Sequence, residues 1–161
     1  MYKLLLIAAM MTVWLFAHLI QVEEEIAMKT LYQGKRAVNR AAHAAAQQLD
    51  KVSLGDGVVK LDSIAAAEAA KLYLQRNLWV DENGVPLEDT FLRDPVEILV
   101  FEVVNADQKF PYRYVNDRYS FEAVLERPGV VLIVKVVFPR AFHVMRPLEW
   151  ELKGVAELVV G

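Results

Sequence analysis

Residues Met1–Val22 read MYKLLLIAAMMTVWLFAHLIQV, and the next three residues are glutamates. From Leu4 onward, only Thr12, His18 and Gln21 in this stretch are polar. As an α-helix, Leu4–Val22 would be about 28 Å long, roughly the thickness of the hydrocarbon layer of a bilayer. We therefore predict that the segment can span a membrane.

The residues on either side of this segment indicate that it stays attached and how it is oriented. No small-residue cleavage site follows it, because residues 21–25 are bulky or charged. Lys3 and the amino terminus are the only fixed positive charges before it. Since basic flanks tend to remain in the cytoplasm, we expect everything after Val22 to lie outside.

The composition suits one exported domain behind such an anchor. The chain has 161 residues, a net charge of −3 and no cysteine, which leaves room for one hydrophobic core without disulfides or thiolate metal ligands. The acidic balance argues against a nucleic-acid-binding surface, so no nucleic acid is predicted as a partner. We interpret the one basic cluster, Lys35, Arg36 and Arg40, as a solvated helix face.

The apolar segment continues into a second helical pattern without a break. Its apolar positions recur at helical spacing and are Ile26, Leu31, Val38, Ala42, Ala45, Leu49 and Val52. No proline occurs before Pro86, so residues 1–52 are predicted to form one helix of about 75 Å, with residues 1–22 as its membrane or filament-core part. Gly34 marks either a bend or a close helix approach. The alanine run at 41–46 indicates either a thin core helix or a place where another element approaches the backbone.

Residues 53–161 are predicted to form a globular α+β domain packed on this helix. Asp62 is placed to cap a short second helix, and one face of that helix would carry Ile64, Ala67, Ala70, Leu74 and Leu78. The segment Asp81–Gly84 would close it with a turn.

Strand patterns occupy the rest of the chain. Val96–Val104 is predicted to be a strand buried on both sides, and Tyr119–Leu125 alternates like a half-buried strand. Arg127–Gly129 would reverse the chain into Val130–Phe138, so that the last two strands form a hairpin. Leu148–Lys153 alternates again, and residues 155–160 would continue this strand past a bulge or bend at Gly154. The model is an antiparallel sheet of about four strands with one face on the helices.

Motifs for catalysis, cofactors and metals are missing from the sequence. It contains no GxGxxG, GxxxxGK[ST], GxSxG or HExxH pattern. His18, His43 and His143 lie far apart in the chain, so we expect no metal site, no cofactor and no enzymatic activity.

Two polar or aromatic groups have more than one reading. His18 is an ionisable group inside an apolar segment, and it either has a function or sits neutral near the interface. Phe110, Tyr112, Tyr114 and Tyr119 form either a sugar-binding patch or ordinary sheet packing.

The order of these parts resembles the type IV pilin superfamily. It resembles in particular the minor, TadE-like pilins of tight-adherence (Tad) pili, on the pattern Leu31-Tyr32-x-x-x-x-Ala37-x-x-x-Ala41-Ala42. The resemblance implies a structural subunit whose apolar helix first holds it in the cytoplasmic membrane and then packs in the core of an extracellular filament at the cell surface. It implies copies of the same chain and a pilus assembly machinery as partners.

The residues expected to make this packing contact are those of the apolar segment, namely Leu4, Leu5, Leu6, Ile7, Ala8, Met11, Trp14, Leu15, Phe16, Leu19 and Ile20.

The chain departs from the family in two places. Many pilins carry a glutamate at the fifth mature position, whereas residue 5 here is Leu5. Pilin precursors also carry a basic leader ending in glycine or alanine, whereas only Met1–Lys3 precede the apolar helix, so either these residues are the whole preceding segment or a leader has been removed. The alternatives to a filament subunit are a single-pass membrane protein whose outer domain binds a partner in an envelope or secretion complex, and an exported enzyme or carbohydrate binder.

Overall fold

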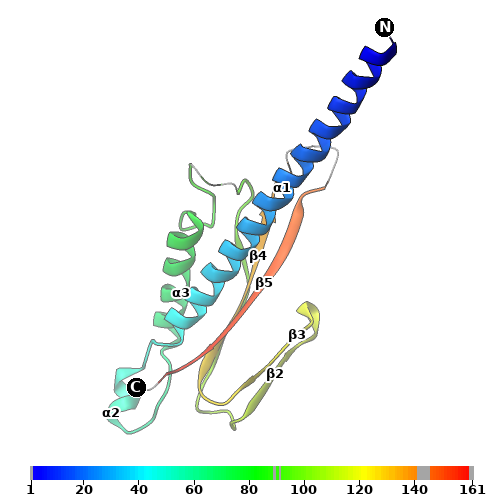
Figure 1. The fold of residues 1–161 in the computed structure, drawn as a ribbon. Coiled ribbons are helices and arrows are strands. Elements are labelled where there is room, and N and C mark those ends of the chain that lie inside the picture. The colour runs from blue at the N-terminus through cyan, green and yellow to red at the C-terminus, as the bar shows by residue number, and fades with distance from the viewer. Residues whose placement is uncertain (1, 89, 91, 141–145, 160–161) are drawn as a thin grey trace.

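The computed structural model describes residues 2–88, 90, 92–140 and 146–159. The chain is α+β, as predicted, with helices in its first half and strands in its second (Figure 1). The elements are α1 (Tyr2–Ala45), α2 (Lys51–Gly55), α3 (Ser63–Leu78), β1 (Glu97–Val104), β2 (Tyr112–Asn116), the 3-10 turn η1 (Asp117–Tyr119), β3 (Phe121–Leu125), β4 (Gly129–Phe138) and β5 (Leu148–Glu157).

Helix α1 is one continuous helix of 44 residues, about 66 Å long. The prediction that it reaches Val52 is wrong at its carboxyl end. After α1, Asp50 N–H donates to the Lys60 carbonyl at 2.9 Å and Asp62 N–H to the Gln48 carbonyl at 2.8 Å. These bonds join two segments in an antiparallel bridge, Leu49 to Leu61, and the Asp50 side chain caps α2. Pairing between these two segments of the same chain therefore accompanies the end of the helix at Ala45, although the helical spacing of apolar residues continues to Val52. Among the nearby apolar residues Val58, Val59 and Leu61, only Leu61 makes a bridge.

The strands form a three-stranded antiparallel sheet, β1-β4-β5, and a separate two-stranded ribbon, β2-β3. The predicted hairpin of β3 and β4 is wrong, because β3 pairs with β2 and β4 pairs with β1 and β5. The strand β2 was absent from the sequence prediction. A tight turn at η1, with Ser120 in the left-handed region at φ 46°, joins it to β3.

The most apolar strand, β4, lies in the centre of the sheet. Val130, Leu132, Val134 and Val136 face the helices, and Val131 belongs to a second core under the β2-β3 ribbon. Strand β1 lies at the sheet edge and is mostly half-exposed or exposed, so the prediction that it is buried on both sides is wrong. The strand that is buried on both faces is β4, because among the described strands it alone pairs on both edges and contributes residues to both hydrophobic cores.

Helix α1 packs on β4, β5 and α3 with its carboxyl half. The buried residues of this half are small, namely Ala27, Gly34, Ala37, Val38, Ala41, Ala42 and Ala45. A Cβ at Gly34 would lie 2.6 Å from Leu152 Cδ1. For Gly34, close approach is therefore confirmed, but the approaching element is strand β5 and not a helix. Alanines of the alanine run are buried in the core, as expected for a thin core helix.

The cap of α3 is as predicted, whereas its buried face and the course of β5 differ in part. Asp62 caps α3, accepting from the backbone N–H groups of Ile64 and Ala65. The buried face of α3 is Ala66, Ala70, Leu74 and Leu78, whereas Ile64 is 75% exposed and does not belong to it. Strand β5 pairs with β4 without a register shift through Gly154, so no bulge occurs there. Val160 lies outside the described residues.

Candidate membrane and assembly segment

The amino-terminal half of α1 projects beyond the globular domain (Figure 1). A stretch of 18 residues in this helix is long and apolar enough to cross a membrane, and none of these residues is buried. Every residue of the predicted packing segment is exposed, from Leu4 at 71% to Ile20 at 42%. A long helix of this kind is compatible with a membrane anchor or with a pilin-like helix. An apolar surface of this extent needs lipid or another apolar surface to cover it.

Helix α1 stays continuous where its exposed half meets its packed half. Glu23 is 8% exposed and Ala27 is 5% exposed, so the domain begins to cover the helix within one turn of Val22. The Glu23 side chain is therefore largely shielded from solvent. Glu25 accepts from Lys29 at 2.7 Å on the opposite side of the helix, and this ion pair lowers the pKa of the Glu25 carboxyl. The apolar half is thus held in a fixed direction relative to the domain.

His18 lies on the exposed surface of the apolar half and stacks on Trp14. The two ring centroids are 5.4 Å apart and the planes differ by 7°. This stacking covers one face of the imidazole with an apolar ring. A His at this place is therefore compatible with an apolar environment, and a further function for it stays a hypothesis.

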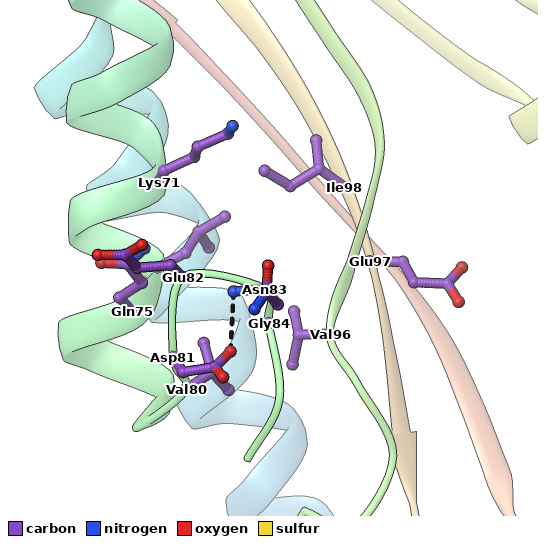
Figure 2. Close-up of a pocket in the computed structure, with 11 residues that line it drawn as sticks. Lys71, Gln75, Val80, Asp81, Glu82, Asn83, Gly84, Val96, Glu97 and Ile98 are labelled. Carbon is purple, nitrogen blue, oxygen red and sulfur yellow. Dashed lines mark hydrogen bonds between the residues drawn. The ribbon is translucent and has the colours of Figure 1, made fainter. Parts of the chain in front are cut away.

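A pocket of about 400 Å³ lies between α3, the turn after it and the start of β1 (Figure 2). Its charged groups do not converge. The Asp81 carboxylate accepts from the backbone N–H groups of Asn83 and Val85, both at 2.8 Å, and Glu97 points away from α3 (Figure 2). Lys71 is the only cation among those of its lining residues that the structure describes. The pocket indicates no particular reaction, and the absence of enzymatic activity stays a prediction.

The aromatic group proposed as a sugar-binding patch is used in packing instead. Tyr114 is 4% exposed and Tyr119 is 8% exposed, and Phe110 and Tyr112 pack against the core beneath the ribbon. Burial also raises the pKa of the Tyr114 hydroxyl. Of the two readings, sheet packing is confirmed for these side chains.

The described residues contain no group of three or more His, Cys, Asp or Glu that could hold a metal ion. His18 and His43 lie on different parts of α1, and His143 lies outside the described residues. The absence of a metal site and of a cofactor stays a prediction.

The structure brings together one surface that the sequence did not indicate. A groove of about 580 Å³ lies along the seam between α1 and the carboxyl end of α3. We call it the cationic groove and define it by Lys29, Tyr32, Arg36, Arg40, Arg76 and Trp79. Only part of the groove could be recognised in the sequence. Arg36 and Arg40 are one helical turn apart on α1, but Arg76 and Trp79 lie at the carboxyl end of α3.

Lys35, the third member of the basic cluster noted in the sequence, does not line the cationic groove. Its ammonium group donates to the backbone carbonyl of Lys153 on β5. Partial burial, and then the charge of Lys153, lowers the pKa of Lys35. The cluster is therefore split between two faces of α1.

Comparison of the chain with protein-family models, curated proteins and solved structures finds no match.

Proposed function

We propose that this chain is a pilin-like structural subunit of a helical extracellular filament, assembled by packing of its apolar helix against the same helix of neighbouring copies. The observation that carries the proposal is the continuity of α1. One unbroken helix is exposed and mostly apolar from Tyr2 to Val22 and is packed into the domain in its second half.

This continuity matters because a repeating filament requires every subunit to have the same shape. A tether that serves only to hold a domain at a membrane works equally well when it is flexible. Here Gly34, the only glycine within α1, lies in the packed half and is buried against β5, so no weak point separates the apolar half from the domain. Helices joined rigidly to their domains can pack side by side while the domains form a regular outer layer.

The same helix also supports the steps before assembly. Its apolar half has the length of a membrane span, and Trp14 and Phe16, both more than half exposed, provide large apolar surfaces for lipid or for a neighbouring helix. We infer that the subunit is anchored in the cytoplasmic membrane with its domain outside, and that a pilus assembly machinery transfers it into a filament at the cell surface.

Electron microscopy of material sheared from cells that produce the chain tests the proposal. Filaments that contain the chain support it, whereas recovery of the chain solely as a detergent-dependent monomer contradicts it and favours the single-pass anchored protein with a partner-binding domain. Leu15→Asp places a charge in the centre of the apolar half and is expected to abolish filaments. Val124→Asp places the same charge on β3, at a side chain that is 56% exposed, and is expected to leave filaments intact.

A further inference from the structure

The cationic groove concentrates positive charge in a chain whose net charge is negative. Its described lining residues include four cations and no carboxylate. Among the ion pairs between described residues, only Lys29 of these four takes part, with Glu25 at 2.7 Å. Arg40 donates to the Asn77 side chain at 2.8 Å, which leaves its charge uncompensated. The groove therefore attracts an anion, and its guanidinium groups can bind phosphate oxygens in a bidentate way.

Two exposed aromatic side chains border these cations. Tyr32 is 60% exposed and Trp79 is 59% exposed. Trp79 ends α3 in the left-handed region at φ 56° and ψ 54°, which is an unusual conformation for a bulky residue. Backbone bonds on both sides hold it there, from Val80 N–H to the Gln75 carbonyl at 3.2 Å and from Leu87 N–H to the Trp79 carbonyl at 2.9 Å. The backbone at Trp79 is thus held in place while its indole is exposed at the surface, and Trp and Tyr are the residues enriched where proteins meet lipid headgroups.

The groove lies on the part of the domain that follows the apolar segment of α1. Lys29 comes seven residues after Val22, about 10 Å further along the helix, and Arg36 comes fourteen residues after Val22, about 21 Å further. The headgroup layer extends roughly 5 to 7 Å beyond the hydrocarbon on each side, so Lys29 is the cation of the groove on α1 that lies nearest to it. The carboxyl end of α3 and the segment after it lie on the side of the domain nearer the amino terminus of α1 (Figure 1). Val85 and Leu87 in that segment are 44% and 49% exposed. Since membrane helices tilt by about 20° on average, a tilt toward α3 brings this end of the domain closer to the headgroups.

We propose that the cationic groove binds the headgroups of anionic phospholipids in the leaflet that faces the domain, and so holds the domain against the membrane before assembly. The inference rests on the proposed function in one respect, because α1 must be inserted in the bilayer. Continuity of the groove with the spanning helix and its exposed Tyr and Trp favour a lipid surface over an acidic protein as the occupant.

The test uses the full chain in nanodiscs of phosphatidylcholine alone or with an equal part of phosphatidylglycerol. Because the chain has no cysteine, Asn83→Cys provides a single site for a fluorescent donor in the segment after α3. Energy transfer to an acceptor on the lipid headgroups reports how close this end of the domain is to the bilayer. We expect transfer to rise with phosphatidylglycerol and to fall again at high salt.

Arg36→Gln with Arg76→Gln is expected to lower the ratio of docked to undocked domains several-fold and by at most about thirtyfold, since a cation at an anionic surface contributes up to about fivefold and the effect falls off within a Debye length. Lys51→Gln with Lys60→Gln makes the same change in net charge at exposed positions near α2 and is expected to leave the transfer unchanged. An equal loss in both double variants would overturn the assignment to the groove.

Two further outcomes separate this inference from the proposed function. Insertion is measured by co-elution with the discs and by protection of residues 4–22 from hydrogen exchange, and a chain that does not insert contradicts both the proposed function and this inference. A chain that inserts but shows the same transfer in both lipid mixtures overturns the lipid inference alone. Binding of polyglutamate to the detergent-solubilised chain, lost in the Arg36 and Arg76 variant and without any effect of lipid, would assign the groove to an acidic protein partner and likewise overturn it.

Discussion

Gly154 of β5 lies so close to Val38 of α1 that a Cβ added to the glycine would stand 2.9 Å from Val38 Cγ1 and 3.3 Å from the Val38 carbonyl oxygen. One helical turn earlier, Gly34 of α1 is in the reverse relation to Leu152 of β5. The helix and the strand thus each supply a glycine where the other supplies a branched side chain. This interlock fixes the direction in which the apolar half of α1 leaves the domain.

The first prediction concerns this interlock. Gly154→Ala is expected to destabilise the domain by about 1 to 3 kcal/mol, because the new methyl group meets a branched side chain and a backbone oxygen that cannot both move away. The loss is measured as a lower urea midpoint of the detergent-solubilised chain, followed by tryptophan fluorescence. Gly55→Ala is the control, because a Cβ there meets nothing within 4 Å. Equal midpoints for Gly154→Ala and the unaltered chain would show that the helix is free to move off the sheet.

The second prediction separates a filament from a simple anchor. Ala9→Leu with Ala17→Leu keeps the helix apolar, so membrane insertion is expected to be unchanged, but it adds bulk where neighbouring helices would approach. Filament yield is expected to fall by about tenfold or more, which corresponds to about 1.4 kcal/mol or more at the subunit contact. The measurement is the amount of chain in sheared filaments relative to the amount in membranes.

Met10→Leu is the matched control for this pair, because it conserves volume at an exposed position of the same helix. A full yield of filaments from the Ala9 and Ala17 variant would mean that these positions face lipid or solvent and that the packing contact lies elsewhere on α1.

The third prediction concerns a buried polar link between the two halves of the chain. Asn105, 9% exposed, accepts from Leu61 N–H at 2.8 Å and donates to the Leu61 carbonyl at 3.1 Å. Asn105→Ala leaves both backbone groups of Leu61 without this partner and is expected to cost about 1 to 3 kcal/mol of stability. Asn83→Ala, at an exposed side chain, is expected to change the urea midpoint little. A small effect at Asn105 would indicate that water replaces the amide.

Local patterns in the sequence were sufficient for some parts of the fold. The apolar run from Leu4, the helical period after it and the capping residue Asp62 each act over a few neighbouring residues, and the corresponding elements occur in the structure. The pairing of distant strands could not be predicted from such local patterns, because it depends on which strand is most favourably buried. Gly129 seemed to close a hairpin, but it leads the most apolar strand into the centre of the sheet, where a Cβ on this residue would lie 2.5 Å from the Ala156 carbonyl oxygen.

The same distinction applies to the functional surfaces. The exposed apolar segment could be predicted because all of it lies on one continuous helix. The cationic groove could not, since Arg36 and Arg76 are brought together by the packing of α1 on α3. Each arginine alone is typical of a solvated helix face.

The fourth prediction concerns acid stability. Hydrogen bonds from Ser53 and Val52 lower the pKa of the Asp50 carboxyl below its ordinary value of 3.8, and the hydrogen bond and charge of Arg113 lower that of Glu122 below 4.5. A depressed folded-state pKa gives stability that is present above the unfolded-state value and is lost as pH falls through the folded-state value. The domain is therefore expected to lose stability as the pH drops below 4.5.

Asp50→Asn with Glu122→Gln should flatten this acid limb, measured as urea midpoints across a pH series. Glu88→Gln removes an exposed carboxyl and serves as the control. An acid limb of the same slope in the double variant would assign the loss to other carboxyl groups.

The last prediction asks whether the domain depends on the apolar half of α1. A fragment that begins at Ala27 keeps the packed part of the helix and removes the whole exposed apolar segment, so it is expected to be folded, monomeric and soluble without detergent. Its fluorescence should report native packing of Trp150, which stacks on Phe138 with ring centroids 5.9 Å apart. A second fragment that begins at Glu23 includes the one carboxylate of α1 that is buried, and a higher urea midpoint for it would measure what that residue adds. An insoluble or unfolded Ala27 fragment would mean that the apolar half stabilises the domain, and α1 could not then exchange lipid for neighbouring helices while the domain stayed unchanged.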